Sequence, residues 1–314
     1  MPMRVGILGA GFGLYGYLPA LIDGCGANVL LPDSYRARLK LRDDIRHFSE
    51  RVEWVVDEEA LLGSSDAIVI SRRPEDQIAC VKSSFAYTNI KRILLEKPIA
   101  PTPEAATSLL NSLYERGTIV RIGFTFRYLI WGQALLAWSK TCKKSPLEIT
   151  WKFQAHHYCH DLYIWKRKVN SGGGALRFYG IQLVALLAEI GYETASKSVV
   201  SATKFDEAEN WRAVFHSPSL PDCSIDIQTN SMTQGFSVRS LNVDDKEWRG
   251  IDFLDPFETD LAVSGIDSRL PALTAICQDL LHGNTRVQMW YQKSVDLWKC
   301  VERVTKSTAL KKFS

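Results

Sequence analysis

The sequence predicts an α/β protein with two domains, and three observations support this. Short apolar strands alternate with helical segments from residue 4 to residue 124, which is typical of a parallel, doubly wound sheet. A glycine-rich turn directly follows the first strand. At 314 residues the chain exceeds what one hydrophobic core usually holds, and its second half changes to strands separated by Pro, Asp, Asn and Gly turns.

Apolar runs of strand length mark the sheet of the first domain, at residues 4–8, 28–31, 52–56, 66–70, 90–95 and 119–124. Helix-compatible segments connect them, at residues 17–22, 38–48, 57–62, 75–86 and 102–116. The last helix has the clearest signals, because Thr102 suits the N-cap, Pro103 suits the first helical position and Gly117 ends it. We expect a ligand site at the carboxyl ends of these strands.

The composition indicates a globular protein with reduced thiols. A formal net charge of +3, from 38 basic and 35 acidic residues, is too small to indicate a nucleic-acid or membrane partner. The seven cysteines are odd in number and include no Cys-x-x-Cys motif. No signal-peptide pattern precedes the first strand, and no run approaches the roughly 20 apolar residues of a membrane helix. We therefore expect a cytoplasmic protein.

The glycine-rich turn has the pattern of a phosphate cradle. Its first glycine allows a tight turn, its second lets the backbone approach a pyrophosphate, and free N–H groups at the helix start attract the anion. The fit is imperfect, because Leu14 stands where a third glycine would follow Gly9, and Gly16 completes the spacing only from Gly11. Such turns can also serve only as connections. The position directly after the first strand favours a dinucleotide site, with candidates Gly9, Gly11, Phe12, Gly13 and Leu14.

Residues after the second and fourth strands bear on the choice of cofactor. Asp33 lies about 20 residues beyond the glycine turn, where a carboxylate holds the adenosine ribose hydroxyls of NAD. Arg36 and Arg38 are close enough in sequence to accept the 2′-phosphate of NADP instead. Ser71 and Arg72 follow the fourth strand, where an arginine can meet a phosphate. We expect NAD or NADP, with NAD favoured; the alternative for Asp33 is an ordinary turn residue.

The apolar residues 93–95 stop abruptly at Glu96, Lys97 and Pro98. Pro98 disfavours a helical conformation at Lys97, so both charges belong to the carboxyl end of a strand. An ammonium that is partly desolvated there has a lowered pKa and can exchange a proton with a hydroxyl. Lys97 is therefore the candidate catalytic residue. The alternative is a strand end with two solvated charges.

Short motifs in order along the chain resemble those of the glucose–fructose oxidoreductase/inositol dehydrogenase family (Gfo/Idh/MocA). They are Leu-Pro-Ala-Leu at residues 18–21, Glu-Lys-Pro at 96–98, Thr-Pro-Glu-Ala at 102–105, Gly-Phe-Thr-Phe-Arg-Tyr at 123–128 and Gly-Gly-Gly-Ala-Leu at 172–176. The resemblance covers roughly residues 3–190. It implies a Rossmann domain at residues 1–122 and an α+β domain with an open, mostly antiparallel sheet at residues 123–314.

The resemblance also implies a class of substrate and a mode of assembly. In that family the substrate, usually a sugar, inositol or nucleotide sugar, lies between the open sheet and the nicotinamide. The sheet commonly pairs protein copies, so we expect a homodimer or homotetramer. The resemblance adds Gln77, Glu96 and Thr125 to the cofactor candidates, although Gln77 replaces a frequent His and Thr125 replaces an Asn.

The second domain is predicted to contain a helix at residues 131–139 and strands at residues 148–153, 198–205, 211–216, 224–229, 236–241 and 246–253. Two helices close the chain, at residues 270–281 and 287–306.

Three histidines follow the strand at residues 148–153. If that strand continues, His156 and His160 share one face, whereas His157 and Cys159 take the other. One tetrahedral metal site is then not expected, and Cys159 and His160 point apart, which disfavours a nucleophile pair. We expect no metal and treat the histidines as substrate-pocket candidates. The alternative is structural histidines near a turn.

The helix after the triple glycine lacks the catalytic residues that the family carries there. In the family it carries an Asp, a His four residues later and then a second Asp; here these positions are Phe178, Gln182 and Ala185. Neither Phe nor Gln can relay a proton near neutral pH. Gln182 could still hydrogen-bond a substrate hydroxyl, and Phe178 could pack on a sugar face. The substrate-pocket candidates are Arg127, His156, His157, His160, Trp165, Phe178, Tyr179 and Gln182.

The cofactor motifs are present, but the catalytic residues of the family are replaced, and two functions are compatible with this combination. The first is an NAD(P)-dependent oxidoreductase acting on a hydroxyl or carbonyl of a sugar, cyclitol or nucleotide sugar, with Lys97 as the acid/base. The second is a catalytically inactive protein that binds a nucleotide or sugar on the same fold, as a regulator or accessory subunit. Retention of Lys97 favours the first.

Overall fold

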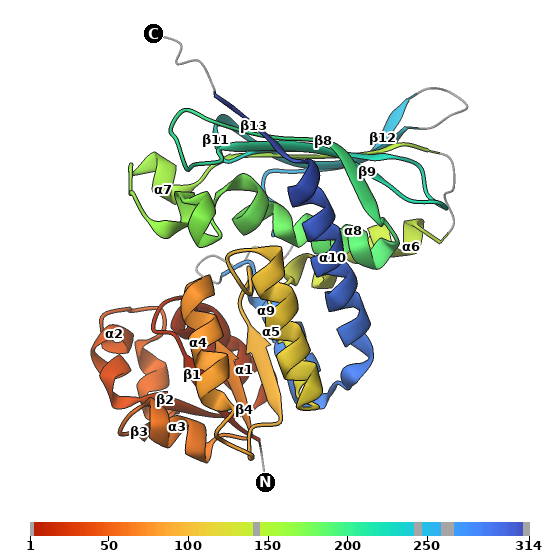
Figure 1. Ribbon diagram of the computed structural model, residues 1–314. Coiled ribbons are helices and arrows are strands. Elements are labelled where there is room, and N and C mark those ends of the chain that lie inside the picture. The colour runs from red at the N-terminus through yellow and green to blue at the C-terminus, as the bar shows by residue number, and fades with distance from the viewer. Residues whose placement is uncertain (1–2, 141–144, 242–246, 259–266, 310–314) are drawn as a thin grey trace. The chain divides into compact units, whose positions relative to one another are not determined.

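The computed structural model describes residues 3–140, 145–241, 247–258 and 267–309 (Figure 1). The chain forms two compact units. Unit 1 comprises Met1–Ala100, Ser108–Tyr128 and Thr259–Gln288, and unit 2 comprises Pro101–Thr107, Leu129–Glu258 and Met289–Ser314. The units interleave along the sequence, and the single domain boundary predicted between residues 122 and 123 stays a prediction.

Unit 1 is built on a six-stranded sheet with the order β3-β2-β1-β4-β5-β6. Its strands are β1 (Arg4–Leu8), β2 (Asn28–Pro32), β3 (Glu53–Val55), β4 (Ala67–Ile70), β5 (Arg92–Leu95) and β6 (Ile119–Ile122). All neighbouring pairs are parallel. The predicted parallel, doubly wound sheet is therefore confirmed. Its strand order reverses between β1 and β4, the place where such sheets bind ligands.

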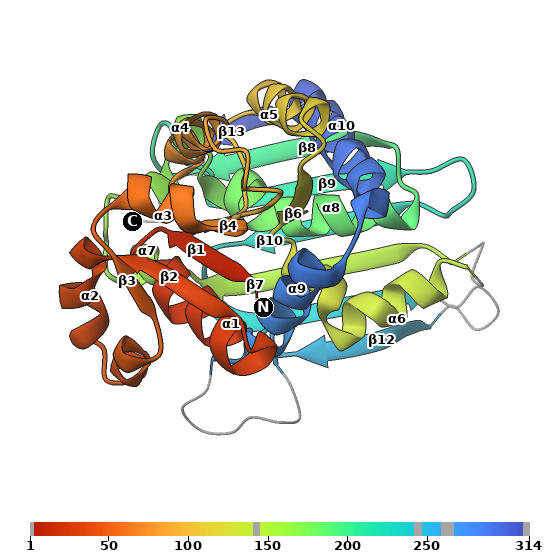
Figure 2. The ribbon, with the colours of Figure 1, turned by 90° about the horizontal axis from the view of Figure 1, so that it is seen from below.

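Helices cover this sheet. They are α1 (Leu18–Cys25), α2 (Arg36–Lys40), α3 (Glu58–Ser64), α4 (Pro74–Ser84), α9 (Leu270–His282) and most of α5 (Pro103–Glu115), with short turns η1 (Gly13–Tyr17), η2 (Asp33–Tyr35), η3 (Arg46–Glu50), η4 (Thr125–Tyr128) and η8 (Thr285–Val287). The single helix predicted at residues 38–48 is wrong, because Arg42 and Asp44 pair with each other in a turn between α2 and η3. α9 lies beside α1 (Figure 2) and adds Leu273 and Ile276 to the same core.

Unit 2 is built on a seven-stranded sheet with the order β12-β11-β7-β10-β9-β8-β13. Its strands are β7 (Leu147–Gln154), β8 (Thr194–Ala202), β9 (Asn210–His216), β10 (Cys223–Gln228), β11 (Asn230–Leu241), β12 (Trp248–Phe253) and β13 (Lys306–Ala309). Only the pairs β10–β7 and β13–β8 are parallel among the strands in the described part. The predicted mostly antiparallel sheet is thus confirmed.

Several strands of unit 2 differ from their predicted bounds. β11 starts at Asn230 rather than near residue 236, because a register shift between Asn230 and Gly235 lets both parts pair with β7. β13 was not predicted. The predicted strand at residues 246–253 begins at a residue outside the described ranges.

The helices of unit 2 are α6 (Ile130–Trp138), α7 (His156–Cys159), α8 (Ile181–Ile190) and α10 (Gln288–Val304), with short turns η5 (Trp165–Arg167), η6 (Val169–Ser171) and η7 (Ala175–Gly180). Figure 1 shows all four α-helices on one side of the sheet. Among the described residues, one helical stretch, Val169–Ile190, is long and apolar enough to span a membrane. Its most apolar 18 residues have a mean hydropathy of 1.3, and 78% of them are buried inside the protein. Buried core helices of soluble proteins meet the same test.

Candidate functional site

The glycine turn of unit 1 brings the ends of β1 and β4 close together. Gly9 has φ +136°, and a Cβ at this position would lie 2.1 Å from the carbonyl oxygen of Ser71. The Gly9 N–H donates to the Tyr35 hydroxyl at 2.9 Å. Only glycine adopts this backbone at such a close approach. Ser71, a predicted cofactor residue, therefore lies directly against the turn.

The helix after the turn starts in a π-helical conformation. η1 continues directly into α1. Gly13 allows the close approach of helix and strand that the missing third glycine would allow, because a Cβ there would lie 2.8 Å from Ile7 Cγ2. Leu14 is buried in the hydrophobic core. Gly16 leaves room for the Phe12 ring, which a Cβ would meet at 2.6 Å. The glycine that approaches the first strand thus comes one residue earlier than the expected pattern places it.

This turn fits the pyrophosphate of a dinucleotide. A Cβ at Gly11 would meet nothing within 4 Å, so the backbone is approachable there. Phe12 provides no side-chain cap for η1. Backbone N–H groups at an uncapped helix start favour an anion.

The residues after β2 form an exposed cluster. Asp33 accepts a hydrogen bond from Arg36 Nε at 2.9 Å, and both side chains are about half exposed. The Arg36 guanidinium lies 4.2 Å from the ring centroid of Trp54. Asp33 therefore stands at the predicted strand end, with its carboxylate engaged by an arginine.

Arg72, after β4, is held by its neighbours in unit 1. It forms an ion pair with Glu58 and contacts the Tyr35 hydroxyl at 3.4 Å and Cys80 Sγ at 3.2 Å. Arg72 borders a cavity of about 190 Å³, which is lined by Leu8, Glu58, Leu62, Arg72, Asp76, Ala79, Cys80 and Ser83.

Lys97 follows β5 and is joined to Pro98 by a cis peptide bond. Gln77, fully buried in α4, donates its amide to the carbonyl of Glu96 at 2.9 Å and to that of Pro98 at 3.0 Å. One side chain thus fixes the main chain on both sides of Lys97. Gln77 Oε1 has no hydrogen-bond partner among the described residues. This orphaned buried acceptor also fits a site for a polar ligand.

Glu96 is bonded through both carboxyl oxygens. Oε1 accepts from the Tyr17 hydroxyl at 2.5 Å, and Oε2 accepts from the Lys97 N–H at 3.1 Å. Burial raises the pKa of Glu96, although the Lys97 charge and the Tyr17 hydrogen bond oppose this rise. Burial and the Glu96 charge together raise the pKa of Tyr17 well above its ordinary value, so Tyr17 is the proton donor in this pair.

The remaining candidates of unit 1 lie just after β6. Thr125 is buried, and its N–H donates to the Gly123 carbonyl at 3.0 Å. The Arg127 guanidinium lies 5.5 Å from the ring centroid of Tyr128 in η4. A Cβ at Gly123 would lie 2.6 Å from Glu96 Oε1, so this glycine lets the segment pass close to the Lys97 loop.

The histidines of unit 2 lie on a helix. The prediction that His156 and His160 extend a strand is wrong, because β7 ends at Gln154 and the Tyr158 N–H bonds to the Ala155 carbonyl to begin α7. The spacing of four residues places the rings of His156 and His160 4.4 Å apart, and both side chains are exposed. The described residues contain no group of three or more His, Cys, Asp or Glu side chains able to hold a metal ion.

His157 points away from this exposed pair. It is 3% exposed and stacks at 6.2 Å on Tyr179. Burial, with the nearby Lys166 and Arg167 charges, lowers the pKa of His157 to about 4, so the imidazole is neutral at pH 7. Its Nε2 and the Tyr158 hydroxyl have no hydrogen-bond partner in the part of the chain that the structure describes.

Several predicted substrate-pocket residues gather in one aromatic cluster. Phe178 meets Trp165 edge-on at 5.3 Å and Tyr179 at 4.8 Å, and Tyr179 meets Phe153 at 4.9 Å. Lys166 Nζ lies 5.1 Å from the Phe178 ring centroid. His157, Trp165, Phe178 and Tyr179 thus belong to one cluster of ring contacts, while His156 and His160 lie at the exposed side of α7.

The triple glycine starts a helix in the same way as the first turn. Gly172 and Gly174 have φ +83° and +86°, and η7 is a π-helical turn that continues into α8. Gly180 faces the ring of Trp211, which a Cβ would meet at 2.5 Å. Gln182 is buried, at 4% exposure.

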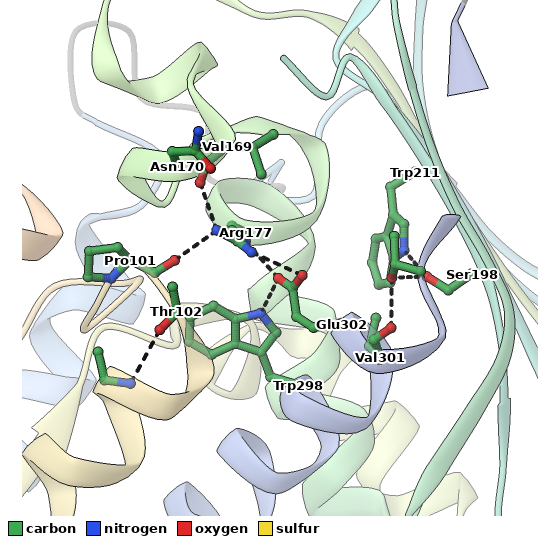
Figure 3. Close-up of polar contacts among 12 residues, drawn as sticks. Pro101, Thr102, Val169, Asn170, Arg177, Ser198, Trp211, Trp298, Val301 and Glu302 are labelled. Carbon is green, nitrogen blue, oxygen red and sulfur yellow. Dashed lines mark hydrogen bonds and ion pairs between the residues drawn. The ribbon is translucent and has the colours of Figure 1, made fainter. Parts of the chain in front are cut away.

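One arginine anchors this helix start (Figure 3). Arg177 binds both carboxyl oxygens of Glu302 in α10, at 2.7 and 3.1 Å. It also donates to the carbonyls of Pro101 and Val169, at 3.2 and 2.8 Å. Trp298 Nε1 donates to the same carboxylate at 2.9 Å. Three chain segments of unit 2 therefore meet at one guanidinium.

The sequence does not predict the contacts of Tyr17 and Arg177, nor the hydrogen bonds of Gln77 to the main chain around Lys97. A signal for Arg177 was present, because a lone charge inside an otherwise apolar helix start needs a buried partner. Nothing in the sequence near Tyr17 indicated that it would meet Glu96.

No protein-family model matches the sequence, and no curated protein matches it. Solved structures match nearly the whole chain. KijD10, a 3-ketoreductase from Actinomadura kijaniata in complex with NADP and TDP-benzene, has a TM-score of 0.72 and 15% identity and covers 99% of this chain and 100% of its own. The WlbA dehydrogenase from Bordetella pertussis, in complex with NADH and UDP-GlcNAcA, has a TM-score of 0.72 and 14% identity, covering 96% of this chain and 95% of its own.

A myo-inositol dehydrogenase from Corynebacterium glutamicum has a TM-score of 0.71 and 13% identity, with 97% of each chain covered. At such identities the likeness concerns the fold. The likeness to these structures confirms the fold that the sequence motifs predicted. The chain has the fold of the Gfo/Idh/MocA-type sugar oxidoreductases.

Proposed function

We propose that the protein is an NAD(P)-dependent oxidoreductase that acts on a hydroxyl or carbonyl of a sugar, cyclitol or nucleotide sugar. The observation that carries this proposal is the fixed position of Lys97 at the end of β5, in a sheet whose glycine turn fits a pyrophosphate. A bound nicotinamide supplies hydride transfer to or from the substrate carbon. Lys97 takes the hydroxyl proton during oxidation or returns it during reduction.

The proposed cofactor residues all belong to unit 1. They are Gly9, Gly11, Phe12, Gly13, Leu14, Asp33, Ser71, Arg72, Gln77, Glu96, Lys97 and Thr125. Asp33 favours NAD, because a carboxylate at the end of β2 suits ribose hydroxyls and repels a 2′-phosphate. Arg36 opposes this preference, since it neutralises Asp33 and could bind that phosphate.

The proposed substrate residues are Arg127, His156, His157, His160, Trp165, Phe178, Tyr179 and Gln182. Aromatic faces such as Trp165 and Phe178 suit the C–H faces of a sugar ring, and a neutral His157 can donate or accept a hydrogen bond. The nucleotide-sugar class is supported by the UDP-GlcNAcA and TDP-benzene complexes of the similar folds.

The expected setting is a soluble, cytoplasmic homodimer or homotetramer. Among the described residues, the α-helices of unit 2 lie on one side of its sheet in Figure 1, which leaves the other face for a second copy. That face carries polar residues such as Thr150, Arg212 and Asp226, so the contact would be largely polar.

The test is a titration of purified protein with NADH and with NADPH, followed by nicotinamide fluorescence. We expect saturable binding, tighter for NADH, and a reduced but still measurable affinity in Lys97→Ala. A screen of UDP-sugars, TDP-sugars and inositols should then give turnover that Lys97→Ala reduces by at least 100-fold, an order of magnitude typical of general acid–base catalysis. Full turnover in Lys97→Ala would refute the role of Lys97.

The second candidate is a binding protein without turnover. The positions that carry Asp and His in the family are Phe178 and Gln182, which cannot relay a proton. Binding of NADH or of a nucleotide sugar with no turnover across the screen would favour this function. Folded protein that binds neither coenzyme would refute the oxidoreductase.

A further inference from the structure

A tyrosine and a glutamate beside Lys97 form a tight pair that proton transfer by Lys97 alone does not require. Tyr17 is 0% exposed, and its hydroxyl lies 2.5 Å from Glu96 Oε1. The other carboxyl oxygen accepts the Lys97 N–H at 3.1 Å. The Tyr17–Glu96 pair is thus bonded to the main chain of the proposed acid/base.

The surroundings leave the pair little freedom. A Cβ at Gly123 would lie 2.6 Å from Glu96 Oε1 and 2.8 Å from the Tyr17 hydroxyl. On the other side of Lys97, Gln77 holds the carbonyls of Glu96 and Pro98. The carboxyl group is therefore fixed against the Lys97 main chain, and its charge interacts with the charge of Lys97.

The charged and titratable groups that face the pair come from η1, from α9 and from the residue before α9. Tyr17 comes from η1, Cys277 from α9, and Arg269 directly precedes α9. Arg269 is bonded to Asp267 at 2.6 Å, and its guanidinium also lies 4.7 Å from the Phe12 ring centroid. Burial raises the pKa of both members of the pair, whereas the Lys97 and Arg269 charges oppose the rise at Glu96.

We propose that the Tyr17–Glu96 pair positions Lys97 and sets its charge state, a role that rests on the proposed function of Lys97 as acid/base. The ionised form of Glu96 favours the ammonium form of Lys97, and the Tyr17 hydroxyl favours that ionised form by donating to it, against the effect of burial. Loss of either group therefore shifts Lys97 toward the neutral amine. Both act through Lys97, so they are positioning residues.

The protonation of Lys97 can be measured without cofactor or substrate. Residues 93–116 form one tryptic peptide that contains Lys97 as its only lysine, because trypsin does not cleave a Lys-Pro bond. Trace labelling of the folded protein with acetic anhydride over a pH series, read by mass spectrometry, gives the pH midpoint at which Lys97 becomes reactive. Lys82, an exposed lysine of α4, is the internal reference.

In Glu96→Gln we expect the Lys97 midpoint to fall by about 1 pH unit, since an opposite charge within about 6 Å shifts a pKa by 1 to 3 units. In Tyr17→Phe we expect a smaller fall in the same direction. Tyr192→Phe is the matched control, because it removes another buried hydroxyl that donates at 2.8 Å, to Pro221, and it should leave the midpoint unchanged.

An unchanged or higher midpoint in folded Glu96→Gln would overturn the proposal, and if that variant fails to fold, Tyr17→Phe decides in the same way. An equal shift in Tyr192→Phe would also overturn it, since the effect would then be general. Failure of the NADH titration would refute the proposed function, but the labelling result would still report on the pair.

Discussion

Two glycine-rich helix starts, one in each unit, can be compared directly. η1 and η7 are both π-helical turns that follow glycines with positive φ and lead into the helices α1 and α8. Both use a glycine without Cβ to admit a neighbour, Ile7 at Gly13 and Trp211 at Gly180. The backbone conformation of the two helix starts is the same, but their side chains differ. The first turn has the glycines that a pyrophosphate site needs, whereas the second carries Phe178 and Gln182 at the positions where the family resemblance places an acid and a base.

The comparison teaches that backbone geometry and reactive side chains can diverge separately. A cofactor turn works mainly through backbone N–H groups, so its requirements are visible as glycines. A proton relay works through particular side chains, so it can be lost with the fold intact. Variants of the two turns and of the residues around them can therefore separate cofactor binding from stability.

The largest effect is expected at Gly9. Gly9→Ala places a Cβ against the Ser71 carbonyl at φ +136°, and should lower the free energy of unfolding by about 3 kcal/mol and abolish NADH binding. Gly11→Ala is the matched variant, because its Cβ meets nothing within 4 Å. It should weaken NADH binding with almost no loss of stability. Urea unfolding and NADH titration of both variants check this, and equal stability of the two would contradict it.

The second effect concerns His157, which lies against the second helix start. Its pKa of about 4 in the folded protein lies below its ordinary 6.5, so the unfolded chain binds more protons between these pH values. This contribution to stability is complete above pH 6.5 and is lost as the pH falls, by about 2 kcal/mol at pH 5. In His157→Gln the loss of stability between pH 7 and pH 5 should be correspondingly smaller. An identical pH dependence in the two proteins would show that His157 titrates normally.

The third effect tests the packing at Gly180. Gly180→Ala forces a methyl group against the Trp211 ring and should cost about 1 to 2 kcal/mol of unfolding free energy. Gly63→Ala, in α3, is the control, since its nearest neighbour would lie 3.7 Å away and alanine favours a helix. NADH affinity should be normal in both variants. Weaker NADH binding in Gly180→Ala would mean that the second turn also serves the cofactor.

The smallest effect on stability is expected at Arg36. Its ion pair with Asp33 is exposed, so Arg36→Ala should change the unfolding free energy by less than about 1 kcal/mol. The variant frees the Asp33 carboxylate, and the ratio of NADPH to NADH dissociation constants should rise. Parallel fluorescence titrations measure that ratio. A fall would mean that Arg36 does not compete for a 2′-phosphate.

The sequence predicts the parallel sheet well, because its strands are continuous apolar runs and its turns are marked by glycine and proline. It fails at α7, where residues 156–160 have no periodicity and the backbone turn at Ala155 decides the conformation. It also missed β13, whose polar residues Lys306 to Thr308 resemble a helix end. Local patterns cannot indicate pairing with a strand a hundred residues away.

The candidate site is predictable only in part, for a similar reason. Lys97 and the glycine turn stand out because each lies at a strand end with a recognisable pattern. Gln77, Tyr17 and Arg177 act through contacts with residues distant in sequence, Glu96, Pro98 and Glu302 among them. Their roles depend on packing, which no local signal encodes.

The parallel pairing of β13 with β8 makes the edge of the sheet a strand of 4 residues instead of one of 9 residues. β13 runs along β8 from Lys306 beside Val199 to Ala309 beside Ala202, and occupies main-chain groups that would otherwise face solvent. An exposed strand edge is a template for association with other chains. A protein shortened before residue 306 should therefore aggregate through β8, even though it loses almost none of its hydrophobic core.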